Sequence, residues 1–117
     1  MTVRRIVTNI HAPEPDSARA FYEALLDLEV VMDHGWILTF ATEAYSMVQI
    51  NVASDGGSGT PVPDLSIEVD NVDEVYQRAK DGGFEIVYDI INEPWGVRRF
   101  YLRDPFGKLV NILSHLG

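Results

Sequence analysis

The sequence contains no cysteine among its 117 residues. Disulfides, thiolate nucleophiles and thiolate metal ligands are therefore excluded, and we expect a cytoplasmic protein. No apolar run approaches the roughly 18 residues that a membrane-spanning helix needs, so we expect no membrane partner. Arg4 and Arg5 precede only a short apolar stretch, which polar residues interrupt, and we therefore expect no secretory signal.

Basic residues are also few. Nine lysines and arginines stand against eighteen aspartates and glutamates, which gives a net charge of −9. Such a field repels the phosphates of nucleic acids and of anionic membranes, and it favours cationic ligands. We therefore expect no nucleic-acid partner. Solubility is the simpler explanation of the acidic excess, and attraction of a cationic ligand is the alternative.

The hydrophobic pattern repeats on the two sides of a glycine-rich stretch. The first half predicts a strand, a helix and three strands, at residues 3–10, 17–26, 29–32, 36–40 and 45–52. The second half predicts the same order, at residues 65–69, 72–81, 84–91, 97–103 and 109–114. Between them, residues 53–63 have the composition of a flexible linker, because Gly and Ser dominate.

This duplication predicts an α+β fold built from two βαβββ modules. Module one covers about 3–52, the linker 53–63, and module two about 64–115, all within one domain. Each module alone is too small to bury a stable core. We therefore expect the modules to pair into one curved, cup-shaped sheet with the helices outside. Pairing within one chain and swapping between two chains both remain open.

The last quarter of the chain carries the most specific motif. Trp95-Gly96 opens a predicted hairpin, whose second turn is Asp104-Pro105-Phe106-Gly107. Asp suits the first position of such a turn, Pro the second and Gly the fourth. Phe100 and Arg103 lie on the strand between the two turns.

Together with Phe21-Tyr22 and Val69–Val72, this hairpin resembles the vicinal oxygen chelate superfamily. That group includes glyoxalase I, extradiol dioxygenases, and the fosfomycin and bleomycin resistance proteins, and the chain looks closest to the bleomycin-resistance branch. The resemblance implies a homodimer and a small-molecule ligand inside the cup. One departure is local. Asp27 follows Leu26 where the family usually has Gly, and Asp accepts the left-handed conformation less readily.

The resemblance also places the family's four metal-ligand positions near Val7, Gln49, Asp64 and Asn111. Val7 cannot bind a metal, two positions offer neutral amides, and only Asp64 is an anion. Divalent ions are held tightly by imidazole and carboxylate ligands, so we predict no metal, no cofactor and no catalytic residues. A weaker site, formed by His11, His115 and Glu68 at the rim of the cup, is the alternative.

These expectations favour a metal-free small-molecule-binding protein that sequesters a cationic or aromatic compound. The alternative is a divalent-metal-dependent glyoxalase-like lyase or isomerase, or a dioxygenase. Strand alternation and the aromatic residues suggest the ligand-binding candidates: Trp36, Phe40, Met47, Gln49, Asn51, Asp64, Glu68, Trp95 and Asn111. We expect Arg98, Arg99 and Arg103 to form salt bridges on a sheet edge.

Overall fold

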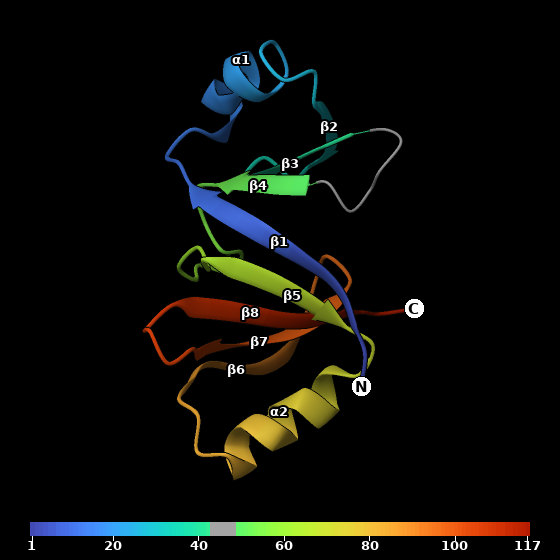
Figure 1. The fold of residues 1–117 in the computed structure, drawn as a ribbon, viewed down its shortest axis with the longest axis vertical. Helices are drawn as coiled ribbons and strands as arrows, with labels where there is room; N and C mark the ends of the chain where they lie inside the picture. Colours follow the sequence, from blue (N-terminus) through green and yellow to red (C-terminus); the bar gives the residue numbers. More distant parts are fainter. Residues whose placement is uncertain (43–48) are drawn as a thin grey trace. The chain divides into compact units, whose positions relative to one another are not determined.

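The computed structural model describes residues 1–42 and 49–117. The chain divides into two compact units (Figure 1). We call residues 7–62 the N-terminal unit, and residues 1–6 with 63–117 the C-terminal unit. Met47 and the first half of the predicted strand 45–52 lie outside the described residues. Among the described residues, no helix combines the length and the apolar character needed to cross a bilayer.

Within its described residues, the N-terminal unit has one short helical segment and four strands. Its elements are β1 (Val3–His11, which begins in the other unit), the 3₁₀ turn Pro15–Ala18, α1 (Arg19–Tyr22), β2 (Glu29–Asp33), β3 (Ile37–Ala41) and β4 (Gln49–Ala53). Strands β2, β3 and β4 pair antiparallel in that order, and β4 pairs parallel with β1. Leu38, Phe40 and Val52 form its core, against which Tyr22 packs.

The predicted helix over 17–26 is shorter in the structure. The 3₁₀ turn and α1 together end at Tyr22, and Leu25 and Leu26 are exposed. A four-residue helix gains few backbone hydrogen bonds, so its sequence pattern alone cannot hold it. Asp27 has φ 56°, so it adopts the left-handed conformation in the place where the family usually has glycine.

The C-terminal unit has a longer helix and four strands. Its elements are β5 (Leu65–Val69), α2 (Val72–Asp81), β6 (Ile86–Glu93), β7 (Val97–Arg103) and β8 (Leu109–His115). β5 pairs parallel with β8, β8 antiparallel with β7, and β7 antiparallel with β6. Asn71 caps α2 as predicted, because its side chain accepts a hydrogen bond from the backbone N–H of Glu74.

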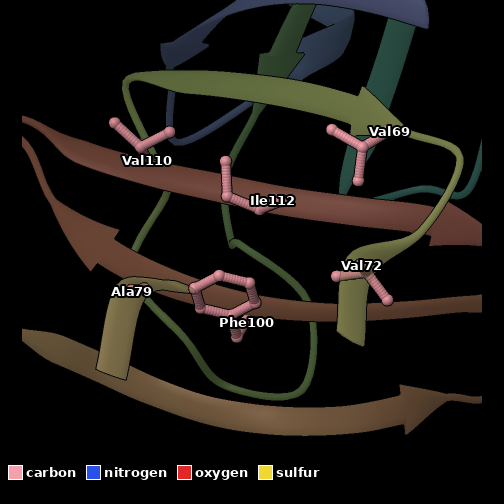
Figure 2. Close-up of a cluster of buried hydrophobic side chains, with 6 residues drawn as sticks. All are labelled: Val69, Val72, Ala79, Phe100, Val110 and Ile112. Carbon is pink, nitrogen blue, oxygen red and sulfur yellow. The ribbon is translucent and has the colours of Figure 1, made fainter. Parts of the chain in front are cut away.

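The apolar stripe of α2 packs on one face of this sheet (Figure 2). Val72 and Ala79 of the helix meet Phe100, Val110 and Ile112 of the strands, and all five side chains are buried. The order strand, helix, strand, strand, strand therefore occurs in both units. The predicted α+β class and the two βαβββ modules are confirmed.

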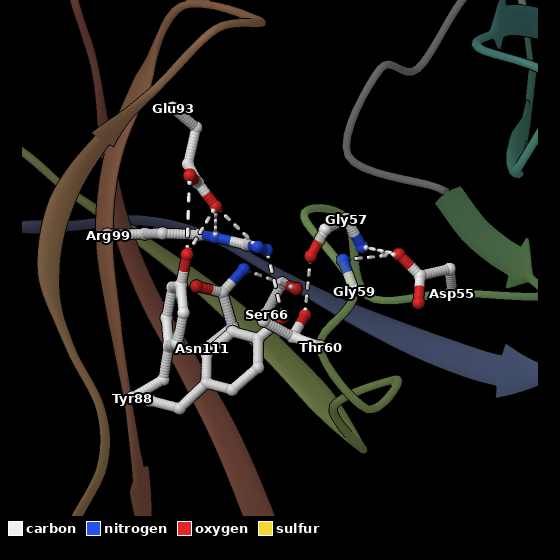
Figure 3. Close-up of polar contacts among 10 residues, drawn as sticks. Asp55, Gly57, Gly59, Thr60, Ser66, Tyr88, Glu93, Arg99 and Asn111 are labelled. Carbon is white, nitrogen blue, oxygen red and sulfur yellow. Dashed lines mark hydrogen bonds and ion pairs between the residues drawn. The ribbon is translucent and has the colours of Figure 1, made fainter.

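The predicted glycine-rich linker contains a turn that is held by hydrogen bonds to Asp55. The Oδ2 atom of Asp55 accepts the backbone N–H of Gly57 at 2.9 Å and of Gly59 at 3.2 Å (Figure 3). Gly57 and Gly59 have φ 91° and 74°, a conformation that glycine adopts without steric cost. The glycines here therefore serve a tight turn.

We predict that Phe100→Ala lowers the free energy of unfolding by about 3–5 kcal/mol, because it leaves a cavity in the core between α2 and the C-terminal sheet. Phe106→Ala is the matched control, since Phe106 is 85% exposed, and it should change stability by less than about 0.5 kcal/mol. Urea denaturation measures both variants. Equal losses would contradict the assignment of Phe100 to the core.

Candidate functional site

The sheet of the C-terminal unit has a polar face opposite α2. Along β7, Phe100 packs toward the helix, so Arg99 and Tyr101 point to the other face. Along β8, Val110 and Ile112 pack toward the helix and Asn111 points away. We call this surface the polar face and define it by Ser66, Glu68, Tyr88, Glu93, Trp95, Arg99, Tyr101, Asn111 and His115.

A buried ion pair lies on the polar face. The Nη2 atom of Arg99 is 2.6 Å from Oε2 of Glu93, and its Nε donates to the same oxygen at 2.8 Å (Figure 3). The two side chains are only 3% and 2% exposed. Removing two charges from water is costly, so the pair persists only because further hydrogen bonds and contacts satisfy it.

Three aromatic rings surround the Arg99 guanidinium. Its central carbon lies 4.8 Å from the ring centroid of Trp95, 4.9 Å from that of Tyr101 and 5.4 Å from that of Tyr88. Its Nη1 atom also donates to the Tyr101 hydroxyl at 2.9 Å. A cation over an aromatic face is stabilised by the ring quadrupole, the more so when water is excluded. We call Arg99, Glu93 and these three rings the arginine cage.

Asn111 stands beside the cage, because it pairs with Tyr101 across β7 and β8. It is 7% exposed, and its Nδ2 donates to the Ser66 hydroxyl at 3.1 Å. Its Oδ1 is buried and accepts no hydrogen bond from any residue that the structure describes. A buried acceptor without a donor costs free energy, so this atom is suited to a ligand that brings a donor.

The two carboxylates predicted for the site already have partners. Glu68 lies between Arg5, whose Nε is 3.1 Å from its Oε1, and His115, whose Nδ1 is 2.9 Å from its Oε2. The Oδ2 of Asp64 accepts the backbone N–H of Leu109 at 2.9 Å. Asp64 therefore has a structural role at the start of β5, and Arg5 balances part of the charge of Glu68.

The N-terminal unit has a polar chain of its own. Thr39 donates to Oδ1 of Asn51 at 2.5 Å, and Nδ2 of Asn51 donates to Asn9 at 2.8 Å. Gln49 begins β4, opposite Ala41 of β3. Trp36 is half-buried, and its ring lies 6.1 Å from that of His34.

The expected position of Phe40 is corrected by the structure. The side chain is fully buried in the core, with its ring 5.2 Å from that of Tyr22. Because side chains alternate along β3, Thr39 and Phe40 point to opposite faces of the sheet. Thr39 lies on the same face as Asn51, and Phe40 lies on the face that packs into the core. Phe40 is therefore not a wall of a ligand site.

The sequence did not single out the arginine cage. All three arginines form salt bridges as predicted, but not on a sheet edge, because β7 lies between β6 and β8. The pairs of Arg98 with Asp73, at 3.1 Å, and of Arg103 with Glu85, at 3.5 Å, are exposed, whereas the pair of Arg99 with Glu93 is buried. The sequence contained one indication that Arg99 is buried. Arg99 alternates with Phe100 in a strand that the hairpin pattern places beside two other strands.

A family model described as a glyoxalase-like domain matches residues 6–117. The chain belongs to the glyoxalase-like family. The predicted resemblance to the vicinal oxygen chelate superfamily is thereby confirmed. A sequence comparison with curated proteins found no match to the chain.

Several solved structures have a fold similar to that of this chain. A glyoxalase/bleomycin resistance protein/dioxygenase superfamily member from Vibrio splendidus is 15% identical, with a TM-score of 0.67 over 98% of this chain and 100% of its own. A methylmalonyl-CoA epimerase is 14% identical, with a TM-score of 0.70 over 100% and 97%. The Mn(II)-bound glyoxalase from Novosphingobium aromaticivorans is 16% identical, with a TM-score of 0.62 over 96% and 38%. At these identities the likeness shows a shared fold.

The residues of this glyoxalase-like chain fit a divalent metal poorly. Of the four family positions, Val7 is a buried aliphatic residue, and Asp64 is bonded to the backbone. Gln49 and Asn111 offer neutral amides. Among the described residues, no group of three or more His, Asp or Glu side chains is placed to hold an ion. His115 lies beside Glu68, but among the described residues no third His, Asp or Glu side chain joins them to form a metal site.

We predict that Glu93→Gln lowers the free energy of unfolding by about 3 kcal/mol, because it leaves the buried Arg99 charge unpaired. Asp73→Asn is the matched control: it removes the partner of the more exposed Arg98 and should cost less than about 1 kcal/mol. Chemical denaturation measures both.

The double variant Arg99→Met with Glu93→Leu tests the same interpretation. It removes both charges together, so it should be more stable than Glu93→Gln alone. If the double variant is the less stable of the two, burial of an unpaired charge is not the origin of the loss.

Proposed function

We propose that this glyoxalase-like protein binds an aromatic small molecule on its polar face without a resident metal. The observation that carries the proposal is the buried Oδ1 of Asn111, which lacks a donor among the described residues and lies beside the arginine cage. A ligand that carries an N–H or O–H group would supply that donor. Apolar and aromatic walls with a few oriented polar atoms are typical of small-molecule sites.

Trp95 supports an aromatic ligand. The Arg99 guanidinium packs on its ring, and Glu93 in turn fixes the guanidinium. Trp95 is half-buried, so the protein does not enclose the whole residue. A ring held in place by a buried network loses little conformational entropy when a flat compound stacks on it.

The charge of the protein supports a cationic compound at long range, since the net charge is −9. Close to the cage this preference is weaker, because Arg99 balances Glu93 and Arg5 balances part of Glu68. Stacking and the hydrogen bond to Asn111 therefore carry the recognition, while a positive charge accelerates the encounter. An aromatic amine combines these properties.

A thermal-shift screen that includes cationic aromatic compounds and bleomycin identifies a ligand. We then predict that the ligand quenches the fluorescence of the Trp36→Phe variant, in which Trp95 is the remaining tryptophan. The Trp95→Phe variant, which keeps Trp36, should show no quenching. Asn111→Ala should weaken binding about two- to ten-fold through the lost hydrogen bond, whose net value is about 0.5–1.5 kcal/mol.

The reciprocal design separates the two tryptophans. Quenching of Trp36 in the Trp95→Phe variant, with no response in Trp36→Phe, would place the ligand in the N-terminal unit and contradict the proposal. Unchanged affinity of Asn111→Ala would contradict the role of the buried oxygen.

The alternative function, a metal-dependent lyase, isomerase or dioxygenase, predicts a bound divalent ion. We expect protein purified without chelator to contain well below one equivalent of zinc, nickel, manganese or iron, as measured by elemental mass spectrometry. Ligand affinity should also be unchanged after dialysis against EDTA. Stoichiometric metal that EDTA removes together with ligand binding would overturn the metal-free proposal.

A further inference from the structure

The C-terminal unit has a pocket on the face of the sheet that α2 covers. This pocket, of about 350 Å³, lies between the helix and strands β5, β7 and β8. This volume falls within the range of about 300–1,000 Å³ that is usual for small-molecule sites. Val75 and Ala79 of the helix, and Leu102 and Val110 of the strands, are among its apolar walls.

Phe84 also lines the pocket, in the segment that joins α2 to β6. It is 53% exposed, which leaves much of a large apolar side chain in water. Its ring lies against Gly82, where a Cβ atom would approach the ring to 2.8 Å. A ligand that covered this ring would remove apolar surface from water, which is a favourable contribution to binding.

Two guanidinium groups line the same pocket, Arg78 from α2 and Arg103 from the end of β7. Each pairs with a carboxylate at the surface, Arg78 with Glu74 at 2.9 Å and Arg103 with Glu85 at 3.5 Å. Pairs this exposed contribute about 0–1 kcal/mol each, so a ligand carboxylate can replace or share the partner. Guanidinium binds a carboxylate well, because its planar fork of donors matches the two oxygens.

Asp104 is the acidic residue of the lining, and its carboxylate already accepts hydrogen bonds from the backbone. Its Oδ1 accepts the backbone N–H groups of Phe106 at 2.8 Å and Lys108 at 2.9 Å. This carboxylate therefore closes the β7–β8 turn. The pocket combines an apolar interior with two cations that an anionic head group could reach.

We propose that this pocket binds a small amphiphilic carboxylate, with its hydrocarbon tail between α2 and the sheet and its carboxylate at Arg78 and Arg103. The site uses none of the residues of the polar face, so the inference is independent of the function proposed above. It assigns a second ligand class to the same unit.

Calorimetric titration of the full chain with octanoate tests the proposal, with octan-1-ol as the neutral probe of equal length. We predict that octanoate binds about ten-fold more tightly than octanol. Arg78→Gln and Arg103→Gln should each weaken octanoate binding about three-fold, and the double variant about ten-fold, in line with the value of exposed charge pairs. Arg98→Gln is the matched control and should leave the affinity unchanged, because Arg98 does not line the pocket.

Val75→Phe fills the pocket and should abolish binding of both probes. Circular dichroism shows whether each variant is folded, and the exposed arginine substitutions test the proposal even if Val75→Phe does not fold. Equal affinity for octanol and octanoate would overturn the proposal. The proposal would also be overturned if Arg98→Gln weakened octanoate binding as much as the double variant does. The Trp95 fluorescence experiment is unaffected by these outcomes, so the two proposals fail separately.

Discussion

The polar face depends on the buried ion pair between Arg99 and Glu93. Glu93 ends β6 and Arg99 lies near the start of β7, so the turn at residues 94–96 brings the two charges together. The turn itself requires Gly96, whose φ is 89°. The charges can remain out of water only because three aromatic rings and the Tyr101 hydroxyl surround the guanidinium. The orientation of Trp95, and with it the proposed ligand site, follows from this arrangement.

Alternation along the strands gives the C-terminal sheet two chemically different faces. Phe100 and Leu102 belong to the apolar side with α2, while Arg99 and Tyr101 belong to the polar side. The polar side carries the aromatic rings of the arginine cage and the buried Oδ1 of Asn111, which lacks a donor among the described residues, while the other side is mainly apolar. The glyoxalase-like fold supports many chemistries, so these side chains, more than the fold, decide what this member binds.

Much of the architecture could be predicted from the sequence. The duplicated order of elements, the Asn71 cap and the closing hairpin follow from hydrophobic period and turn chemistry, which are local properties. The first helix was overestimated, because Leu25 and Leu26 at the end of the predicted range are exposed and gain little from packing. The glycine-rich stretch looked flexible, because composition does not reveal that Asp55 binds two backbone N–H groups.

The sequence by itself determined the family, the βαβββ order and the poor set of metal ligands. Only the tertiary structure decided which of three arginines is buried, that Phe40 belongs to the core, and that the Asn111 oxygen lacks a donor among the described residues. The physical reason is that periodicity and turns depend on neighbours along the chain. Burial of a charge or an amide depends on neighbours across strands, such as Tyr101 opposite Asn111, which pairing brings together.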